Sequence, residues 1–226
     1  MTPLLVALVC AALGLLVPAL VARIPEPASP DEDKEPYAAI AARPGLRWRA
    51  ALASGVAGAA VGAGVGPHWP LVHLVPMVPV GVALAVVDWR TRLLPTRVVA
   101  PSYAVVVVGV LVGWVATRDT DDLVRAGWGW LVAGGLYWLM WRIYPRGMGY
   151  GDVRLSGVLG LALGQLGWGP LLVGVYAGFL LGGLVGGVLS LARVVDRKGY
   201  PFGPFMLVGS LVGVLWGDAV LAALLR

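Results

Sequence analysis

The sequence predicts an all-α polytopic membrane protein with about eight transmembrane helices. Of the 226 residues, 59% are hydrophobic and only 13% are charged, and the mean hydropathy is +0.84. A soluble domain has about 25% charged residues, so this chain has too little polar surface for a water-soluble globule. Eight apolar runs also have roughly the length that crosses a bilayer. These runs are residues 3–22, 50–66, 71–88, 97–116, 124–143, 153–168, 171–192 and 203–225.

The first apolar run resembles a secretory signal peptide only in its composition. Residues 3–22 lack a preceding basic segment and a small-residue cleavage site before Arg23, so we expect a retained helix. Residues 24–49 are hydrophilic and begin with a proline-rich and acidic stretch, which predicts a flexible cytoplasmic loop without a core of its own. The chain therefore predicts a single membrane-embedded domain over residues 1–226.

The next four runs alternate with short turns. Residues 50–66 are the weakest span, because alanine and glycine contribute little transfer free energy and the run is short. The turn GPHWP joins this run to residues 71–88, and Pro, Gly and Trp suit a short connection at a membrane interface. Residues 97–116 and 124–143 are longer and more clearly apolar, so we expect an antiparallel series of helices.

The last three runs are rich in glycine at helical spacing. Residues 153–168 follow a glycine-rich turn, and residues 203–225 follow the segment YPFGP. Small residues four positions apart let a neighbouring helix approach closely, which favours packing within the protein over a dedicated homodimer interface. In residues 171–192 these glycines are Gly174, Gly178, Gly182 and Gly186.

The positions of the basic residues predict the orientation of the spans. If the segment before the second span is cytoplasmic, nearly all lysines and arginines fall in cytoplasmic loops or span ends. Only Arg118, Arg125 and Arg226 fall on the other side. This bias predicts a multi-pass membrane protein with both termini outside the cytoplasm. The net charge of +5 then reflects membrane orientation, and we expect no nucleic acid partner.

Neither metal binding nor redox chemistry is expected from the sequence. Cys10 is the only cysteine and lies in an apolar run, so the chain has neither an intrachain disulfide nor a CxxC zinc motif. His68 and His73 fall on the predicted outer side without a matching set of carboxylates. We therefore expect no metal ion and no organic cofactor.

Two aspartates differ from the other acidic residues because they lie at the ends of apolar runs. Asp88 ends the third run, and Asp152 begins the sixth after the turn RGMGYGD. Both lie on the predicted cytoplasmic side, so they can meet. Ionisable groups at such positions are costly and tend to be functional, which favours a functional role for the two aspartates. Interface anchoring by neighbouring arginines is the milder alternative explanation.

A pair of nearby carboxylates suits the chemistry of an aspartic peptidase. The two groups share one proton, so the ionised group can deprotonate water while the protonated group polarises a peptide carbonyl. Such a pair titrates as a unit, and neither aspartate receives a fixed acid or base role. Gly147, Gly149 and Gly151 fit this interpretation, because residues without a side chain let a substrate backbone approach Asp152.

Four segments carry a resemblance to a known family. GMGYGDVRL (147–155) resembles the GxGD signature of the prepilin peptidases, the type IV leader peptidase family, which are membrane aspartic peptidases. DWRTRLLPTRVV (88–99) resembles their first aspartate motif, in which proline, here Pro95, follows seven positions later. YPFGPFMLVG (200–209) is similar to the family's entry to the last helix, and GLLVPALVARIP (14–25) weakly resembles the end of its first span.

The resemblance implies a function and a set of site residues. It makes Asp88 and Asp152 the catalytic pair of an inner-membrane protein, with the active site toward the cytoplasm. The implied reaction removes the short leader of prepilin-like membrane proteins of type IV or Tad/Flp pilus and protein secretion systems, at the cytoplasmic membrane face. The residues expected to bind substrate or shape the site are Gly149, Gly151, Pro95, Pro201 and Pro204.

The chain departs from many bacterial members in one respect. Those members carry a larger cytoplasmic domain with paired CxxC motifs after the first span, and they also methylate the new N-terminus. This chain has only residues 24–49 at that place. We therefore expect a short form that is a peptidase without N-methyltransferase activity. The implied partners are prepilin-like substrates and the lipid bilayer.

Two other functions use the same features. In a proton-coupled transporter the aspartates would form a relay, although both lie at one end of the spans and paired broken helices are not evident. In a catalytically inactive membrane scaffold the glycine-rich helices would serve packing alone. Retention of both aspartates with the glycine turn favours the peptidase.

Overall fold

The computed structural model describes residues 1–27, 34–145, 148–191 and 201–226, with the side chains of α9 described up to residue 184. Within these ranges every regular element is a helix, which confirms the predicted all-α class. The helices are α1 (Thr2–Gly14), α2 (Val17–Ala22), α3 (Tyr37–Ala41), α4 (Leu46–Val65), α5 (Leu71–Thr91), α6 (Thr96–Thr117), α7 (Thr120–Ile143), α8 (Tyr150–Leu166), α9 (Trp168–Leu191) and α10 (Gly203–Leu224).

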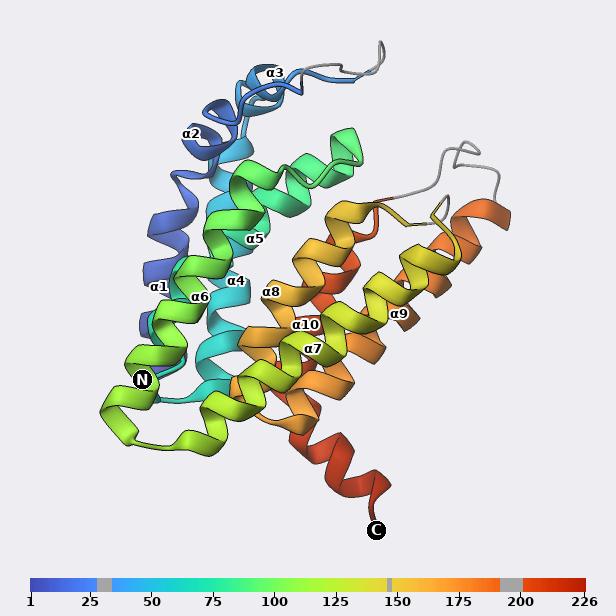
Figure 1. Cartoon of the computed structure of the whole chain (residues 1–226). Coiled ribbons are helices and arrows are strands. Elements are labelled where there is room, and N and C mark those ends of the chain that lie inside the picture. The colour runs from blue at the N-terminus through green and yellow to red at the C-terminus, as the bar shows by residue number, and fades with distance from the viewer. Residues whose placement is uncertain (28–33, 146–147, 192–200) are drawn as a thin grey trace.

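The long helices lie alongside one another in a bundle (Figure 1). Helices α1, α4, α5 and α6 gather on one side, and α7, α8, α9 and α10 gather on the other. The two groups join where α10 packs on α4 and α5 and where α6 packs on α8. The last turn of α5 and the first turns of α6, α8 and α10 form one end of the bundle, which we call the aspartate end. Both chain termini lie toward the other end, the termini end.

The apolar spans predicted from the sequence correspond to the long helices. Four helical segments of the described chain are long and apolar enough to cross a membrane: Thr2–Ala22, Leu71–Thr91, Thr96–Thr117 and Gly203–Leu224. Helix α9 adds a shorter apolar stretch, Trp168–Leu184. Large apolar side chains also face outward, for example Leu8 and Val108, as expected where lipid replaces water as the solvent. The chain is a multi-pass membrane protein.

Two local features of the N-terminal region differ from the sequence prediction. The first predicted span breaks after Gly14, because Pro18 in the first turn of α2 has no N–H to continue the helical hydrogen bonds. The segment predicted as a flexible loop contains the short helix α3, whose Tyr37 and Ile40 are buried in the core. The Tyr37 amide also donates a hydrogen bond to a Glu26 carboxylate oxygen at 2.6 Å.

Helices α9 and α10 approach closely at their glycines. A Cβ placed on Gly209 of α10 would lie 2.3 Å from the backbone nitrogen of Gly178, and one on Gly174 would lie 3.4 Å from the Gly209 carbonyl oxygen. Both contacts are between helices of this chain, so packing within the protein is confirmed for Gly174 and Gly178. The surroundings of Gly186 lie outside the part of α9 whose side chains the structure describes.

We expect Gly209→Ala to destabilise the fold by about 1–3 kcal/mol, because the new methyl group would meet backbone that has no rotamer to relieve the overlap. Gly183→Ala in α9 is the matched control, since nothing lies within 4 Å of its added Cβ. Thermal unfolding of the purified variants in detergent compares the two. Equal midpoints would show that α9 and α10 do not require this close contact.

Candidate active site

Asp88 lies in the last turn of α5 and is buried, with 3% of its surface exposed. The backbone N–H of Gly203, at the start of α10, donates a hydrogen bond to its Oδ2 atom at 2.9 Å. Gly203 has no side chain, and a Cβ there would lie 2.8 Å from that same oxygen. The first turn of α10 therefore holds the Asp88 carboxylate by direct backbone contact.

Asp152 lies in the first turn of α8 and is also buried. Its Oδ2 atom accepts a hydrogen bond from the backbone N–H of Gly149 at 3.1 Å, and its own N–H donates to the Gly149 carbonyl at 3.1 Å. A carboxylate at this third helical position satisfies an N–H at the helix start and favours the positive end of the helix dipole. The glycine turn thus fixes the Asp152 carboxylate at the beginning of α8.

Leu94, in the connection between α5 and α6, brings the two aspartates to one place. A Cβ on Gly151 would lie 2.8 Å from the Leu94 Cβ, and one on Gly203 would lie 3.3 Å from the Leu94 Cδ2. Leu94 is buried, so it packs between the starts of α8 and α10. The two carboxylates interact electrostatically across this contact. Two acidic groups separated along the chain therefore share one buried region at the aspartate end.

An aromatic cluster supports the same region from the α7 and α9 side. The ring of Tyr137 in α7 stacks on Phe179 of α9 with centroids 4.6 Å apart, and Phe202 lies 5.7 Å from Phe179. Phe202 directly precedes Gly203, so the cluster fixes the chain at the start of α10. Tyr137 is buried and also interacts electrostatically with Asp152.

A side-chain contact connects α6 to the beginning of α8. The Tyr103 hydroxyl in α6 donates a hydrogen bond to the Arg154 carbonyl oxygen at 2.8 Å. The Arg154 guanidinium also donates to the Thr96 hydroxyl at the start of α6. These contacts keep the α5–α6 connection, and with it Leu94, beside Asp152.

The other site residues predicted from the sequence also lie at the aspartate end. Pro95 precedes the first residue of α6, and its carbonyl accepts hydrogen bonds from Val98 and Val99. Pro204 lies in the first turn of α10, next to the glycine that binds Asp88. Pro201 precedes the same helix and is partly buried. Gly147 lies outside the described residues.

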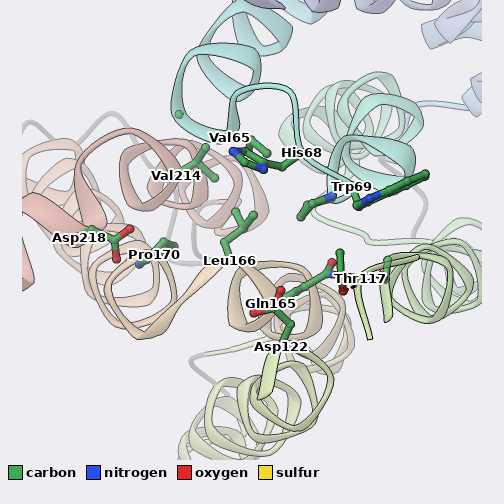
Figure 2. Close-up of a pocket in the computed structure, with 13 residues that line it drawn as sticks. Val65, His68, Trp69, Thr117, Asp122, Gln165, Leu166, Pro170, Val214 and Asp218 are labelled. Atoms are coloured by element: carbon green, nitrogen blue, oxygen red, sulfur yellow. Dashed lines mark hydrogen bonds between the residues drawn. The ribbon is translucent and has the colours of Figure 1, made fainter. Parts of the chain in front are cut away.

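A polar pocket lies at the termini end, far from the aspartates along α5 and α8. It has a volume of about 240 Å³ and is lined by the helix ends there, including His68, Gln165 and Asp218. Figure 2 shows Asp122 and Asp218 on different sides of this hollow, with Trp69 of the α4–α5 turn at its edge. Neither Asp88 nor Asp152 lines the pocket, so its polar groups cannot reach the aspartate pair.

The structure places both histidines at the termini end, away from the two aspartates. His73 lies in the first turn of α5 and is buried, whereas His68 is exposed in the turn before it. Within the described ranges, His, Cys, Asp and Glu side chains form no group of three that could hold a metal ion.

Comparison with known families identifies the kind of protein that carries this pair. The profile of the type IV leader peptidase family matches residues 76–190, which are half of the chain and include both aspartates. The chain belongs to the type IV leader peptidase family. The resemblance seen in the two aspartate motifs is thus confirmed, and the family match also includes Pro95, Gly149 and Gly151.

Curated relatives of this family member are named prepilin leader peptidase/N-methyltransferase. The protein from Aeromonas hydrophila is 31% identical over 164 residues, which are 71% of this chain and 55% of the relative. The protein from Pseudomonas putida is 35% identical over 145 residues, 62% of this chain and 48% of the relative. The chain spans about half the length of the curated relatives that it matches. No solved structure matches it.

The residues that sequence reasoning missed are those that position the pair. Leu94, Tyr137 and Phe179 carry no charge and no signature spacing in the sequence. Two of the positioning residues could have been found from the sequence motifs. Leu94 directly precedes Pro95 in the first aspartate motif, and Phe202 lies within YPFGP. An apolar residue inside a motif that also holds a functional group is therefore a candidate for positioning it.

Proposed function

We propose that this member of the type IV leader peptidase family is a membrane aspartic endopeptidase that removes the leader of prepilin-like substrates. The observation that carries the proposal is the convergence of Asp88 and Asp152 from separate helices, each bound by a glycine N–H at a helix start. Buried carboxylates that interact with one another are typical of sites that move protons.

The geometry supports water activation by the pair. Each aspartate has one oxygen, Oδ2, that accepts a glycine N–H, which leaves its other oxygen for water or substrate. In the shared-proton state, the ionised carboxylate takes a proton from water, and the resulting hydroxide adds to the scissile carbonyl carbon. The protonated carboxyl group donates a hydrogen bond to the carbonyl oxygen. Collapse of the tetrahedral intermediate breaks the C–N bond, and the leaving amine receives a proton from the pair.

The membrane arrangement suits a substrate with one apolar helix. We propose a single domain over residues 1–226 in the inner membrane, with the aspartate end and residues 24–49 toward the cytoplasm, as the distribution of basic residues favours. The substrate helix would lie in the bilayer while its polar leader stays in water, because an extended segment has no hydrogen-bond partners in lipid. The scissile bond then lies at the interface, at the depth of the pair.

We propose that the chain is a peptidase that does not transfer a methyl group to the new N-terminus. The relatives' names include N-methyltransferase, but this chain has only residues 24–49 between its first two spans and no CxxC motif. No metal or organic cofactor is required for the carboxylate mechanism. The substrate class is that of type IV or Tad/Flp pilin-like proteins.

Cleavage of a prepilin-like reporter in membranes that contain the chain tests the proposal. We expect the reporter to lose its leader immediately before the hydrophobic helix, and the product mass to show an unmethylated N-terminus. Intact-mass spectrometry measures both outcomes in one sample. A product heavier by one methyl group would contradict the restricted activity.

Failure on several unrelated prepilins would contradict the peptidase itself. Two alternatives then remain, and proton flux across reconstituted vesicles separates them. Flux that depends on Asp88 would support the transporter, whereas neither flux nor cleavage would support an inactive scaffold. The position of both aspartates at one end of the bundle favours the peptidase, because a transport site is expected near the middle of the spans.

A further inference from the structure

A groove separate from the polar pocket opens at the aspartate end, on the surface formed by α4, α5 and the start of α10. It has a volume of about 430 Å³ and does not contain either aspartate. Its wall is largely apolar and includes Leu46, Ala50, Val82 and Val86. Its rim carries arginines. The groove is therefore amphipathic.

The rim of the groove is positively charged. Arg43 is paired with Glu35, at 2.8 Å and 3.0 Å. Arg49 and Arg90 also line the groove, and the side chain of neither makes an ion pair or a hydrogen bond with any part of the chain that the structure describes. The residues that line the groove include no acidic side chain. The groove therefore favours an anion.

The apolar wall extends from this charged rim along α5. Val82, Val86 and Arg90 are four residues apart and share one helix face. At 1.5 Å per residue, the apolar stripe extends about 12 Å from Arg90 toward the middle of the span. Trp89 lines the same groove with 56% of its surface exposed, as expected for a tryptophan at the lipid–water interface.

These features match one chemical class of occupant. A phospholipid combines a phosphate at the interface with an apolar chain that points toward the bilayer centre. Inorganic phosphate has no part that would contact the stripe, and a basic peptide would be repelled by the rim. Anionic lipids are attracted to arginines at the membrane surface, because each basic residue there contributes favourable electrostatic energy.

We propose that this groove binds an anionic phospholipid, with its phosphate between Arg49 and Arg90 and an acyl chain along Val82 and Val86. Pro204 lines the same groove and follows Gly203, which binds Asp88. A bound lipid therefore packs against the helix start that holds one carboxylate of the pair. The proposal does not depend on the proposed peptidase function, because lipid binding is measured without a substrate.

Quenching of Trp89 by brominated lipid tests the site in the full-length chain. The protein is reconstituted in phosphatidylcholine vesicles with increasing fractions of phosphatidylglycerol whose acyl chains carry bromine. Ten tryptophans contribute to the fluorescence, so Trp89→Phe identifies the part that comes from the groove. We expect a saturable quenching component that requires phosphatidylglycerol, that disappears in Trp89→Phe and that brominated phosphatidylcholine does not reproduce.

Charge variants distinguish a specific site from general surface attraction. Arg49→Gln with Arg90→Gln is expected to raise the lipid fraction at half-quenching by roughly tenfold. Arg97→Gln with Arg142→Gln removes the same charge from exposed positions at the same end that do not line the groove, and is expected to leave the value unchanged.

Three results would overturn the proposal. One is an equal shift in the two charge variants, which would indicate surface potential alone. Another is quenching that persists in Trp89→Phe, which retains both arginines and so is independent of any folding defect in the charge variant. The third is reversal of the quenching by millimolar inorganic phosphate, which would make free phosphate the occupant.

Discussion

Asp88→Asn and Asp152→Asn are each expected to lower cleavage of a prepilin-like reporter by about 10³-fold. An amide neither accepts a proton from water nor shares one with the remaining carboxyl group, so the water would no longer be activated. The fold should persist, because asparagine keeps an oxygen that can accept the glycine N–H bound by each aspartate. Cleavage is measured in membranes at matched expression of each variant.

The combined variant provides a sharper test than either substitution alone. If the two carboxylates act as one unit, Asp88→Asn with Asp152→Asn should cleave no more slowly than the single variants. Asp218→Asn is the matched control, because Asp218 is exposed at the termini end of α10. Cleavage that persists in either single variant, or an equal loss in the control, would contradict the aspartate mechanism.

Composition and hydrophobic runs were sufficient to predict the class and the order of the long helices. The weakest prediction, residues 50–66, corresponds to α4, which begins earlier at Leu46 because Trp48 and its flanking arginines continue the helix. The sequence missed α3, whose Tyr37 and Ile40 are buried only because the folded bundle offers them a surface. Helix α3 depends on tertiary contacts, so periodicity over its few residues carried no signal.

The two acidic residues of the site were predictable from the sequence, but the residues that position their carboxylates were not. Asp88 and Asp152 stand out because charge at the end of an apolar run is costly. Leu94 and Tyr137 are apolar or aromatic residues among many in this chain, and only the packing of α8 and α10 shows their place. The hydrogen bond from Gly203 to Asp88 joins residues 115 positions apart, which local patterns cannot reveal.

Gly203→Ala is expected to lower the rate of cleavage by about 10- to 100-fold with little change in substrate affinity. The added Cβ would lie 2.8 Å from the Asp88 Oδ2, so the carboxylate must move from the N–H that now binds it. Displacement of a reacting group by about 1 Å costs as much as 10²-fold in rate. Gly203 acts through Asp88 and is a positioning residue, so kcat should fall while KM stays nearly constant.

Two other glycines serve as controls, because a Cβ added to each would lie at a different distance from the nearest carboxylate oxygen. A Cβ on Gly149 would lie 3.3 Å from the Asp152 Oδ2, which a small adjustment relieves, so Gly149→Ala should reduce kcat less than Gly203→Ala. Gly135→Ala in α7 has nothing within 4 Å of its Cβ and should cleave normally. The order of the three rates therefore follows the order of the contacts. Equal activity of Gly203→Ala and Gly135→Ala would mean that the start of α10 does not position Asp88 for catalysis.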